Sequence, residues 1–366
     1  MADILPFRGV RYDPAAAHAA LTDLVAPPYD VISPDEQADL YARHPQNVIR
    51  LILGRETDKY ALAARLFQEW QQSGILTADD QPAVYAYHQT FSDPVTNQAC
   101  PDRLGLICLL KLEEYGTGKV LPHEHTLSKA RADRLELMRA THAQFESIYG
   151  LYSDADNSVQ SFLLEYDDRE QMLEQVDDLI GSSHCVERID DPNAHQILAE
   201  MLRDKPIFIA DGHHRYETAL QYRREWRAAH PEISEDMPVA ADYILITLTA
   251  FEDEGLLVLP THRMVRNVAP EKIDRLLDSL ASQFTIAESS LKDIEAALAV
   301  PNAPLAFGLL LPGDKSYRLT LKSSDNSVSL VPGPGSDALK GLAVTVLQRL
   351  ILEKELGIDA AALAAG

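Results

Sequence analysis

The chain has 366 residues, enough for a large hydrophobic core and for two or three subdomains. Hydrophobic residues make up 46% and charged residues 24%, which is typical of a globular protein rather than of a disordered chain. The formal net charge of −23 makes a nucleic-acid partner unlikely, because so acidic a surface repels phosphate groups and the chain has no lysine or arginine run.

The cysteines and the amino terminus indicate the compartment. Cys100, Cys108 and Cys185 are odd in number and lack Cys-x-x-Cys spacing, which argues against a disulfide framework and against a structural zinc site. The first residues show no signal peptide, and no apolar stretch approaches the length of a membrane span. We therefore expect a soluble, cytoplasmic protein with no membrane partner. The oligomeric state stays open.

Two early elements have clear end signals. Ser33 is expected to cap a helix that starts at Pro34, and the helix predicted over residues 59–73 is expected to end at Gly74. Further strands are predicted over residues 47–53, 83–91, 103–115, 147–152, 206–210, 243–251, 256–259, 305–311, 316–322 and 327–331. Further helices are predicted over residues 129–141, 194–203, 216–227, 270–283 and 339–355. Without regular βαβ alternation, this order predicts an α+β (mixed α/β) fold.

The most informative segment is residues 211–215, Asp-Gly-His-His-Arg, between a strand pattern and a helix pattern. Gly212 permits a positive φ and close approach of a ligand to the backbone. Arg215 offers a planar fork that matches phosphate oxygens, and a helix start adds N–H donors. Asp211 can cap the helix or act as a base, and one of the adjacent histidines is expected to face a ligand while the other packs. The segment predicts a phosphate site; the alternative is a capped helix with locally bonded histidines.

A second polar cluster lies at residues 121–126, Leu-Pro-His-Glu-His-Thr, ahead of a predicted helix. Glu124 between two histidines could be a general base, or the cluster could bind a divalent cation. The spacing lacks the i, i+4 histidines of zinc proteases. Arg134, about two turns later, could reach an anion. The alternative is a solvated loop followed by a helix-surface salt bridge.

A third, weaker set is Tyr29 and Asp30, which the prolines at positions 27 and 28 could hold over a pocket. A stiff loop that packs a tyrosine explains the same residues equally well. Neither a Gly-x-x-x-x-Gly-Lys-Ser/Thr loop nor a Gly-x-Gly-x-x-Gly fingerprint occurs, so Walker-type and Rossmann-type nucleotide binding are not supported.

Several of these segments together resemble one bacterial and archaeal family, known chiefly as the domain of unknown function numbered ten-fifteen. The matching stretches are residues 26–32, residues 121–126 with Asp133-Arg134, residues 211–215 and residues 259–263. Members usually continue into a Pro-Gln-Lys-Ser segment that this chain, ending at Ala365-Gly366, lacks.

Residues 211–215 are also similar to the phosphate-binding turn of the ParB/sulfiredoxin superfamily, which includes free-serine kinases and nucleotide-binding partition proteins. This resemblance implies a ParB/sulfiredoxin-like core in which residues 212–215 cradle the phosphates of ATP or ADP and Mg²⁺ neutralises charge near Asp211. Superfamily kinases use a glutamate base outside this turn, and Glu124 is the candidate here. We assign catalysis to Glu124, Asp211 and His214, nucleotide and phosphate binding to Gly212, His213, Arg215 and Arg134, and substrate binding to His123, Thr126, Tyr29 and Asp30.

Three subdomains are expected. Residues 1–155 form an N-terminal α/β subdomain that carries the Pro-Pro-Tyr-Asp and His-Glu-His-Thr loops. Residues 156–268 form the ParB/sulfiredoxin-like subdomain with the phosphate-binding turn, and residues 269–366 form a C-terminal subdomain with a β-meander and a terminal helix.

Three functions are compatible with these residues. The leading hypothesis is a nucleotide-dependent phosphotransferase acting on a small hydroxyl metabolite, with free serine as the best candidate. The second is a non-catalytic nucleotide-binding switch of the partition-protein kind, although the net charge counts against DNA as its partner. The third is a metal-dependent hydrolase with ligands His123, His125, Asp211 and His214.

Overall fold

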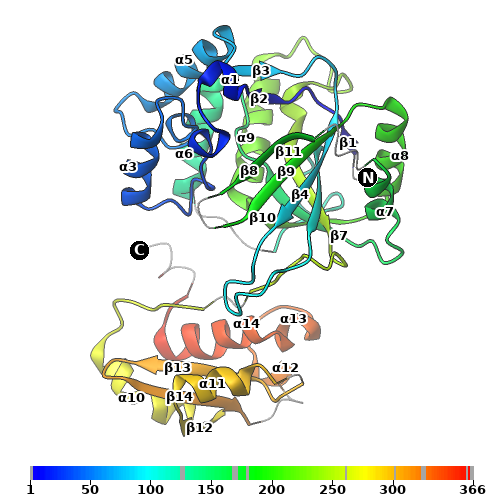
Figure 1. Ribbon diagram of the computed structural model, residues 1–366. Coiled ribbons are helices and arrows are strands. Elements are labelled where there is room, and N and C mark those ends of the chain that lie inside the picture. Colours follow the sequence, from blue (N-terminus) through cyan, green and yellow to red (C-terminus); the bar gives the residue numbers. More distant parts are fainter. Residues whose placement is uncertain are drawn as a thin grey trace. The chain divides into compact units, whose positions relative to one another are not determined.

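The computed structural model describes residues 3–123, 128–166, 172–178, 181–259, 262–300, 302–322, 327–359 and 362 (Figure 1). The chain divides into two compact units, Met1–Leu259 and Pro260–Gly366. Two clusters of buried side chains stabilise the larger unit, and a third stabilises the smaller one. The protein is thus a mixed α+β fold with a large mixed sheet in its first unit.

The large sheet has nine strands among the described residues, taken from both sides of residue 155. Its order is β6-β10-β7-β11-β5-β4-β9-β8, and β1 pairs with β5. The β10–β6 and β11–β7 pairs are parallel, and the other neighbours are antiparallel. The strands are β1 (Ile4–Leu5), β4 (Val84–Thr90), β5 (Arg103–Lys111), β6 (Val120–Leu121), β7 (Ile148–Tyr152), β8 (Met172–Asp177), β9 (Ser183–Ile189), β10 (Ile207–Asp211) and β11 (Tyr243–Ala250). A separate antiparallel pair joins β2 (Val10–Tyr12) to β3 (Leu76–Ala78).

The two faces of this sheet differ in composition. In β5 the alternate residues Leu104, Leu106, Cys108 and Leu110 are buried in the main core, as the period-two pattern predicts. The side chains between them point to the opposite face, where a large cavity lies.

The helices of the larger unit form where end signals and apolar faces coincide. The Ser33 hydroxyl accepts the Glu36 N–H and the Glu36 carboxylate accepts the Ser33 N–H, so the predicted cap is confirmed. Gly74, with φ of +76°, ends the predicted helix at residues 59–73. The helices are α1 (Pro14–Ala17), α2 (Leu21–Leu24), α3 (Pro34–Arg43), α4 (Ile49–Ile52), α5 (Lys59–Gln72), α6 (Ser128–Thr141), α7 (Ser158–Glu165), α8 (Pro192–Arg203), α9 (His213–Ala229) and the 3₁₀ turn η2 (Ala240–Asp242).

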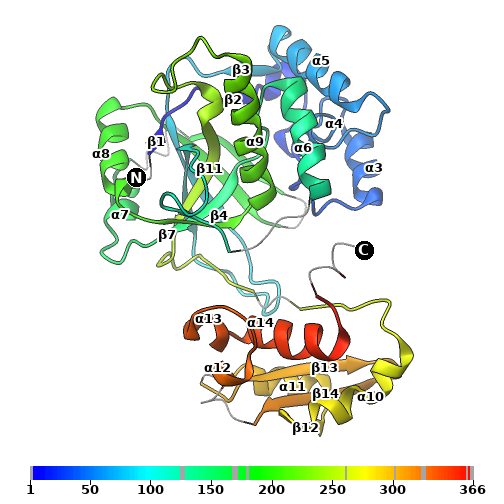
Figure 2. The same ribbon diagram turned by 180° about the vertical axis from the view of Figure 1, so that it is seen from behind.

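These helices lie on either side of the large sheet. Helices α3, α5 and α6 lie on one side, and α7 and α8 lie together on the other (Figures 1 and 2). Helix α9 packs along α6 and contacts β7 and β11. The start of α9 therefore lies where the sheet meets the helical layer.

The smaller unit is an antiparallel sheet of order β12-β14-β13 with helices around it. Its core includes Leu280, Phe284, Leu319, Val346 and Leu350. Its elements are α10 (Pro270–Leu280), β12 (Phe284–Glu288), α11 (Leu291–Leu298), β13 (Ala306–Leu311), β14 (Lys315–Leu321), α12 (Ser327–Leu330), α13 (Asp337–Gly341), α14 (Ala343–Val346) and the π-helical segment η4 (Leu347–Leu356). In the described part of the chain, no helix is both long and apolar enough to cross a membrane.

The strand predicted over residues 47–53 is wrong, because this segment contains the helix α4. The buried Asn47 side chain accepts the Ile49 N–H and donates to the carbonyl oxygens of Asp23 and Val25. These bonds start a helical turn and anchor it to the preceding loop. A short apolar run buried on all sides shows no periodicity that distinguishes helix from strand.

Two further predicted strands are also wrong. Residues 256–259 contain no strand in their described part, because Asp253 accepts the Gly255 N–H and turns the chain outward, leaving Val258 81% exposed. The segment predicted as the last strand of the meander contains α12. Strands β12 and β13 occupy both edges of β14, so β14 has no free edge for another strand.

Candidate functional site

Gly212 sets the geometry of the predicted turn. Its φ of +93° lies in the left-handed region, and an added Cβ would come within 2.7 Å of Ile148 Cγ2. Only glycine meets both demands without strain. The glycine turn is thus confirmed, while the helix begins at His213, earlier than the predicted residue 216.

Asp211 does not cap this helix, so the capping interpretation is wrong. Its carboxylate instead accepts a 2.6 Å hydrogen bond from Arg215 Nη2, one turn along, and its side chain is 62% exposed. The other terminal nitrogen of Arg215, Nη1, donates to the Ser147 carbonyl oxygen at 2.6 Å. The ion pair stands at the amino end of α9 with its carboxylate open to solvent.

The two histidine-bearing segments meet at this turn. His213 is buried, and its Nε2 accepts the backbone N–H of His123 at 3.2 Å. The two rings stand edge to face with centroids 4.4 Å apart, and His123 Nδ1 lies 2.8 Å from the Ile209 carbonyl oxygen. His214 is half-buried, so the packed member of the histidine pair is His213. The predicted residues Glu124, His125 and Thr126 lie outside the described residues.

Arg134 and Tyr29 are also brought together. The Arg134 guanidinium lies 3.9 Å above the centre of the Tyr29 ring and bonds to the Asp133 carboxylate through Nε and Nη2. Burial alone would raise the pKa of Asp133, but hydrogen bonds from Lys59 and Arg134 lower it to about 2. Asp30 is exposed beside this group.

Sequence reasoning missed Glu146, which joins these groups. Its Oε1 accepts the Tyr29 N–H at 3.0 Å, and its Oε2 lies 3.9 Å from Arg215 Nη1. Burial raises the pKa of Glu146, and the positive charge of Arg215 opposes that rise. Together with Arg134 and Arg215, Glu146 lines a small cavity of about 40 Å³. A lone glutamate ahead of a strand carries no sequence signal for such a position.

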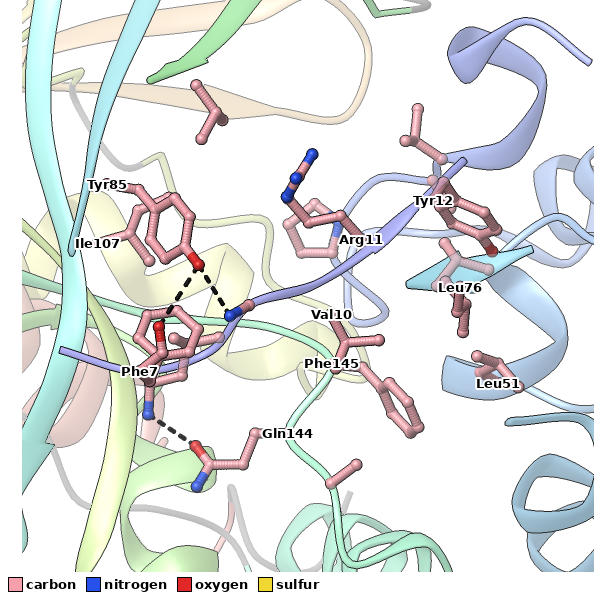
Figure 3. Close-up of a pocket in the computed structure, with 18 of the residues that line it drawn as sticks. Phe7, Val10, Arg11, Tyr12, Leu51, Leu76, Tyr85, Ile107, Gln144 and Phe145 are labelled. Atoms are coloured by element: carbon pink, nitrogen blue, oxygen red, sulfur yellow. Dashed lines mark hydrogen bonds between the residues drawn. The ribbon is translucent and has the colours of Figure 1, made fainter. Parts of the chain in front are cut away.

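A much larger cavity, about 1520 Å³, lies elsewhere in the first unit, and none of the assigned site residues lines it. Figure 3 shows Tyr85 and Ile107 of the sheet, with the Tyr85 hydroxyl bonded to the backbone of the segment that carries Phe7 and Arg11. The two cavities share one wall, formed by Met138 and residues 143–145.

The α9 turn brings the guanidinium of Arg215 and the imidazoles of His123 and His213 to the start of a helix. Two carboxylates lie there: that of Asp211 is exposed, and that of Glu146 is mostly buried. Such a site suits an anion and a proton transfer. Among the described residues, no group of three His, Cys, Asp or Glu side chains is placed to hold a metal ion. His125, one of the four ligands considered for a hydrolase, is outside that set.

Comparison with known proteins identifies the family. The family model described as "Protein of unknown function (DUF1015)" matches residues 4–347, and the chain belongs to this uncharacterised family. Searches of curated proteins and of solved structures gave no significant match.

Proposed function

We propose that the protein is a nucleotide-dependent phosphotransferase that acts on a small hydroxyl metabolite, with free serine as the first acceptor to test. The observation that supports it best is the convergence of His123, Arg134 and His213 with the Asp211–Arg215 pair at the start of α9. A helix amino end with adjacent cations favours phosphate. The resemblance of residues 211–215 to the phosphate-binding turn of the ParB/sulfiredoxin superfamily, and a core of that kind around the turn, are part of this proposal.

Nucleotide binding would break the ion pair between Asp211 and Arg215 and give each residue a new partner. Arg215 would turn its Nη2 toward the phosphate oxygens of ATP or ADP, and Asp211 would bind the accompanying Mg²⁺. The Asp211 side chain is 62% exposed. The Arg215 side chain is only 12% exposed, and its Nη1 donates to the Ser147 carbonyl oxygen, so only its Nη2 has to change partner.

The remaining assigned residues take complementary roles in the proposal. Arg134 and Gly212 border the phosphate site, while Tyr29 and Asp30 lie on the side from which an acceptor would approach. His214 and Glu124 remain the candidates for proton transfer, and His123 and Thr126 for acceptor contacts. Glu124 and Thr126 lie outside the described residues. Phosphoryl transfer needs chiefly positioning and charge stabilisation, which this set could supply.

The test is turnover with Mg²⁺, ATP or ADP, and a panel of amino acids that includes serine, with phosphorylated product measured by mass spectrometry. We expect a product, and we expect Asp211→Asn to lower its rate by about 100-fold or more. Asp204→Asn is the matched control, because Asp204 is also an exposed carboxylate, paired with Lys119 at 2.8 Å.

A parallel titration with labelled nucleotide separates the alternatives. Tight binding without product from any acceptor would favour the non-catalytic nucleotide switch. Stoichiometric zinc, iron or manganese in protein purified without added metal would favour the hydrolase. Neither binding nor product would overturn the proposal.

A further inference from the structure

The large cavity lies against one face of the main sheet. Alternate residues of β4, namely Tyr85, Tyr87 and Gln89, line it, whereas Val84 and Ala86, on either side of Tyr85, are buried in the core. Protein interiors pack with few voids larger than a water molecule. A hollow of about 1520 Å³ over an ordered sheet face therefore has the character of a ligand site rather than of a packing defect.

The lining of this cavity is apolar and aromatic, with few uncompensated charges. The view in Figure 3 shows Phe7, Tyr12, Leu76 and Phe145 around the hollow. Arg11, which also lines it, forms a 2.7 Å ion pair with the Asp79 carboxylate. Burying a charged ligand among such groups costs several kcal/mol without a counter-charge. Arg8 and Glu36 also line the cavity, and Arg8 donates to the Asp79 backbone carbonyl oxygen. The mainly apolar lining thus favours a mainly apolar molecule.

A chain of three hydrogen-bonded polar side chains, Tyr87, His184 and Asp178, interrupts the apolar lining, and we call it the relay. The Tyr87 hydroxyl lies 2.5 Å from His184 Nδ1, and His184 Nε2 lies 3.0 Å from Asp178 Oδ2; all three residues line the cavity. The Tyr87 and His184 rings are nearly parallel, at 9°. The Asp178 carboxylate also accepts the Ser182 N–H at 2.8 Å, which fixes the end of the relay.

The relay determines what Tyr87 offers to a ligand. We assign His184 the tautomer with its proton on Nε2, which donates to the Asp178 carboxylate, so that Nδ1 accepts the proton of the Tyr87 hydroxyl. Burial raises the pKa of Tyr87 to about 12, so the phenol stays protonated. Its oxygen then presents lone pairs to the cavity, and a matching ligand must donate a hydrogen bond.

We propose that this cavity binds a mainly aromatic or aliphatic molecule that carries a hydroxyl group, and that Tyr87 accepts the hydrogen bond of that hydroxyl. His184 and Asp178 are positioning residues that hold the Tyr87 proton away from the ligand. The large cavity shares a wall with the small one beside the α9 turn, but none of the residues assigned to the turn lines it, and the inference does not depend on phosphotransferase activity.

The experiment compares two fluorescent probes of similar shape, 2-naphthol and 2-methoxynaphthalene, titrated into the full-length protein. Only 2-naphthol can donate to Tyr87. Wild-type protein is expected to prefer 2-naphthol by about five- to tenfold, the value of one neutral hydrogen bond. Tyr87→Phe is expected to bind both probes equally, and Leu109→Trp, which places a bulkier side chain in the cavity, to weaken both.

Tyr166→Phe is the matched control, since it removes a phenol that bonds to the Asp191 carboxylate at 3.0 Å outside the cavity lining. It should keep the wild-type preference. Equal affinity of wild-type protein for the two probes, an unchanged preference in Tyr87→Phe, or no binding up to the solubility limit would each overturn the inference. Thermal denaturation confirms that the variants are folded, and neither probe contains phosphate, so kinase inactivity leaves the result intact.

Discussion

The turn at the start of α9 and the large cavity over the sheet differ in charge and in empty volume. At the turn, Arg215 and Arg134 each bond to a carboxylate, and the empty space is about 40 Å³. In the cavity, about 1520 Å³ is open and its lining is mainly uncharged. A ligand at the turn must displace existing partners, whereas a ligand in the cavity fills space. Charge exchange favours ions at the first site, and surface burial favours apolar molecules at the second.

The largest expected effect distinguishes the two faces of β5. Leu110→Ala is expected to lower the free energy of unfolding by about 3 to 4 kcal/mol, because Leu110 is 0% exposed in a filled core. Leu109→Ala is expected to cost about 1 kcal/mol or less, because Leu109 borders open space. Urea denaturation followed by tryptophan fluorescence measures both, since Trp70 and Trp226 belong to the larger unit. Equal losses of unfolding free energy in the two variants would mean that side chains fill the space beside Leu109.

The second prediction tests the backbone of the turn. Gly212→Ala is expected to destabilise the larger unit by about 2 to 3 kcal/mol, through left-handed strain and the contact with Ile148. Gly74→Ala is the control, because Gly74 also has a positive φ but no atom within 4 Å of the added Cβ. Its cost should be about 1 kcal/mol. A comparable loss in both variants would rule out close packing at Gly212.

The third prediction concerns Asp133, whose pKa is lowered to about 2. A lowered carboxyl pKa stabilises the fold above the ordinary value of about 4, and this contribution disappears as the pH falls from about 4 to about 2. Asp133→Asn should therefore cost about 1 kcal/mol near neutral pH, after allowance for solvent screening, and less near pH 3. A pH-independent difference between wild type and variant would contradict the assignment.

The smallest effect has the opposite sign. The pKa of Glu146 is raised by burial, so the folded protein binds a proton there more readily than the unfolded chain. Wild-type protein should therefore gain stability relative to Glu146→Gln as the pH falls through the raised pKa toward the ordinary value of about 4. Chemical denaturation at several pH values measures this trend, and a relative loss over that interval would exclude a buried, reluctantly ionised Glu146.

Local patterns explain what the sequence predicted correctly. The Ser33–Glu36 cap, the alternation in β5 and the strand–glycine–helix order at Gly212 all depend on neighbouring residues, so one sequence is enough to find them. No local pattern shows that the two histidine-bearing segments meet, and the His123–His213 bond is the observation that joins them.

The missed features depend on contacts between distant parts of the chain. Glu146 bonds to Tyr29, which is 117 residues away, and Tyr87 meets His184 across 97 residues. Neither pairing leaves a local spacing to detect. The strand order of the sheet is equally non-local, and it brings segments from both sides of residue 155 into one structure.

The Gln144 side chain bonds to the backbone at the start of β11. Its side-chain amide donates to the Tyr243 carbonyl oxygen at 2.9 Å and accepts the Leu245 N–H at 2.7 Å, before the pairing of β11 with β7 begins at Ile246. The Gln144 side chain thus makes the two backbone bonds that a neighbouring strand would make at Tyr243 and Leu245. Unpaired strand ends recruit other polypeptides into intermolecular sheets. Gln144 satisfies backbone groups at the start of β11 that β7 does not reach.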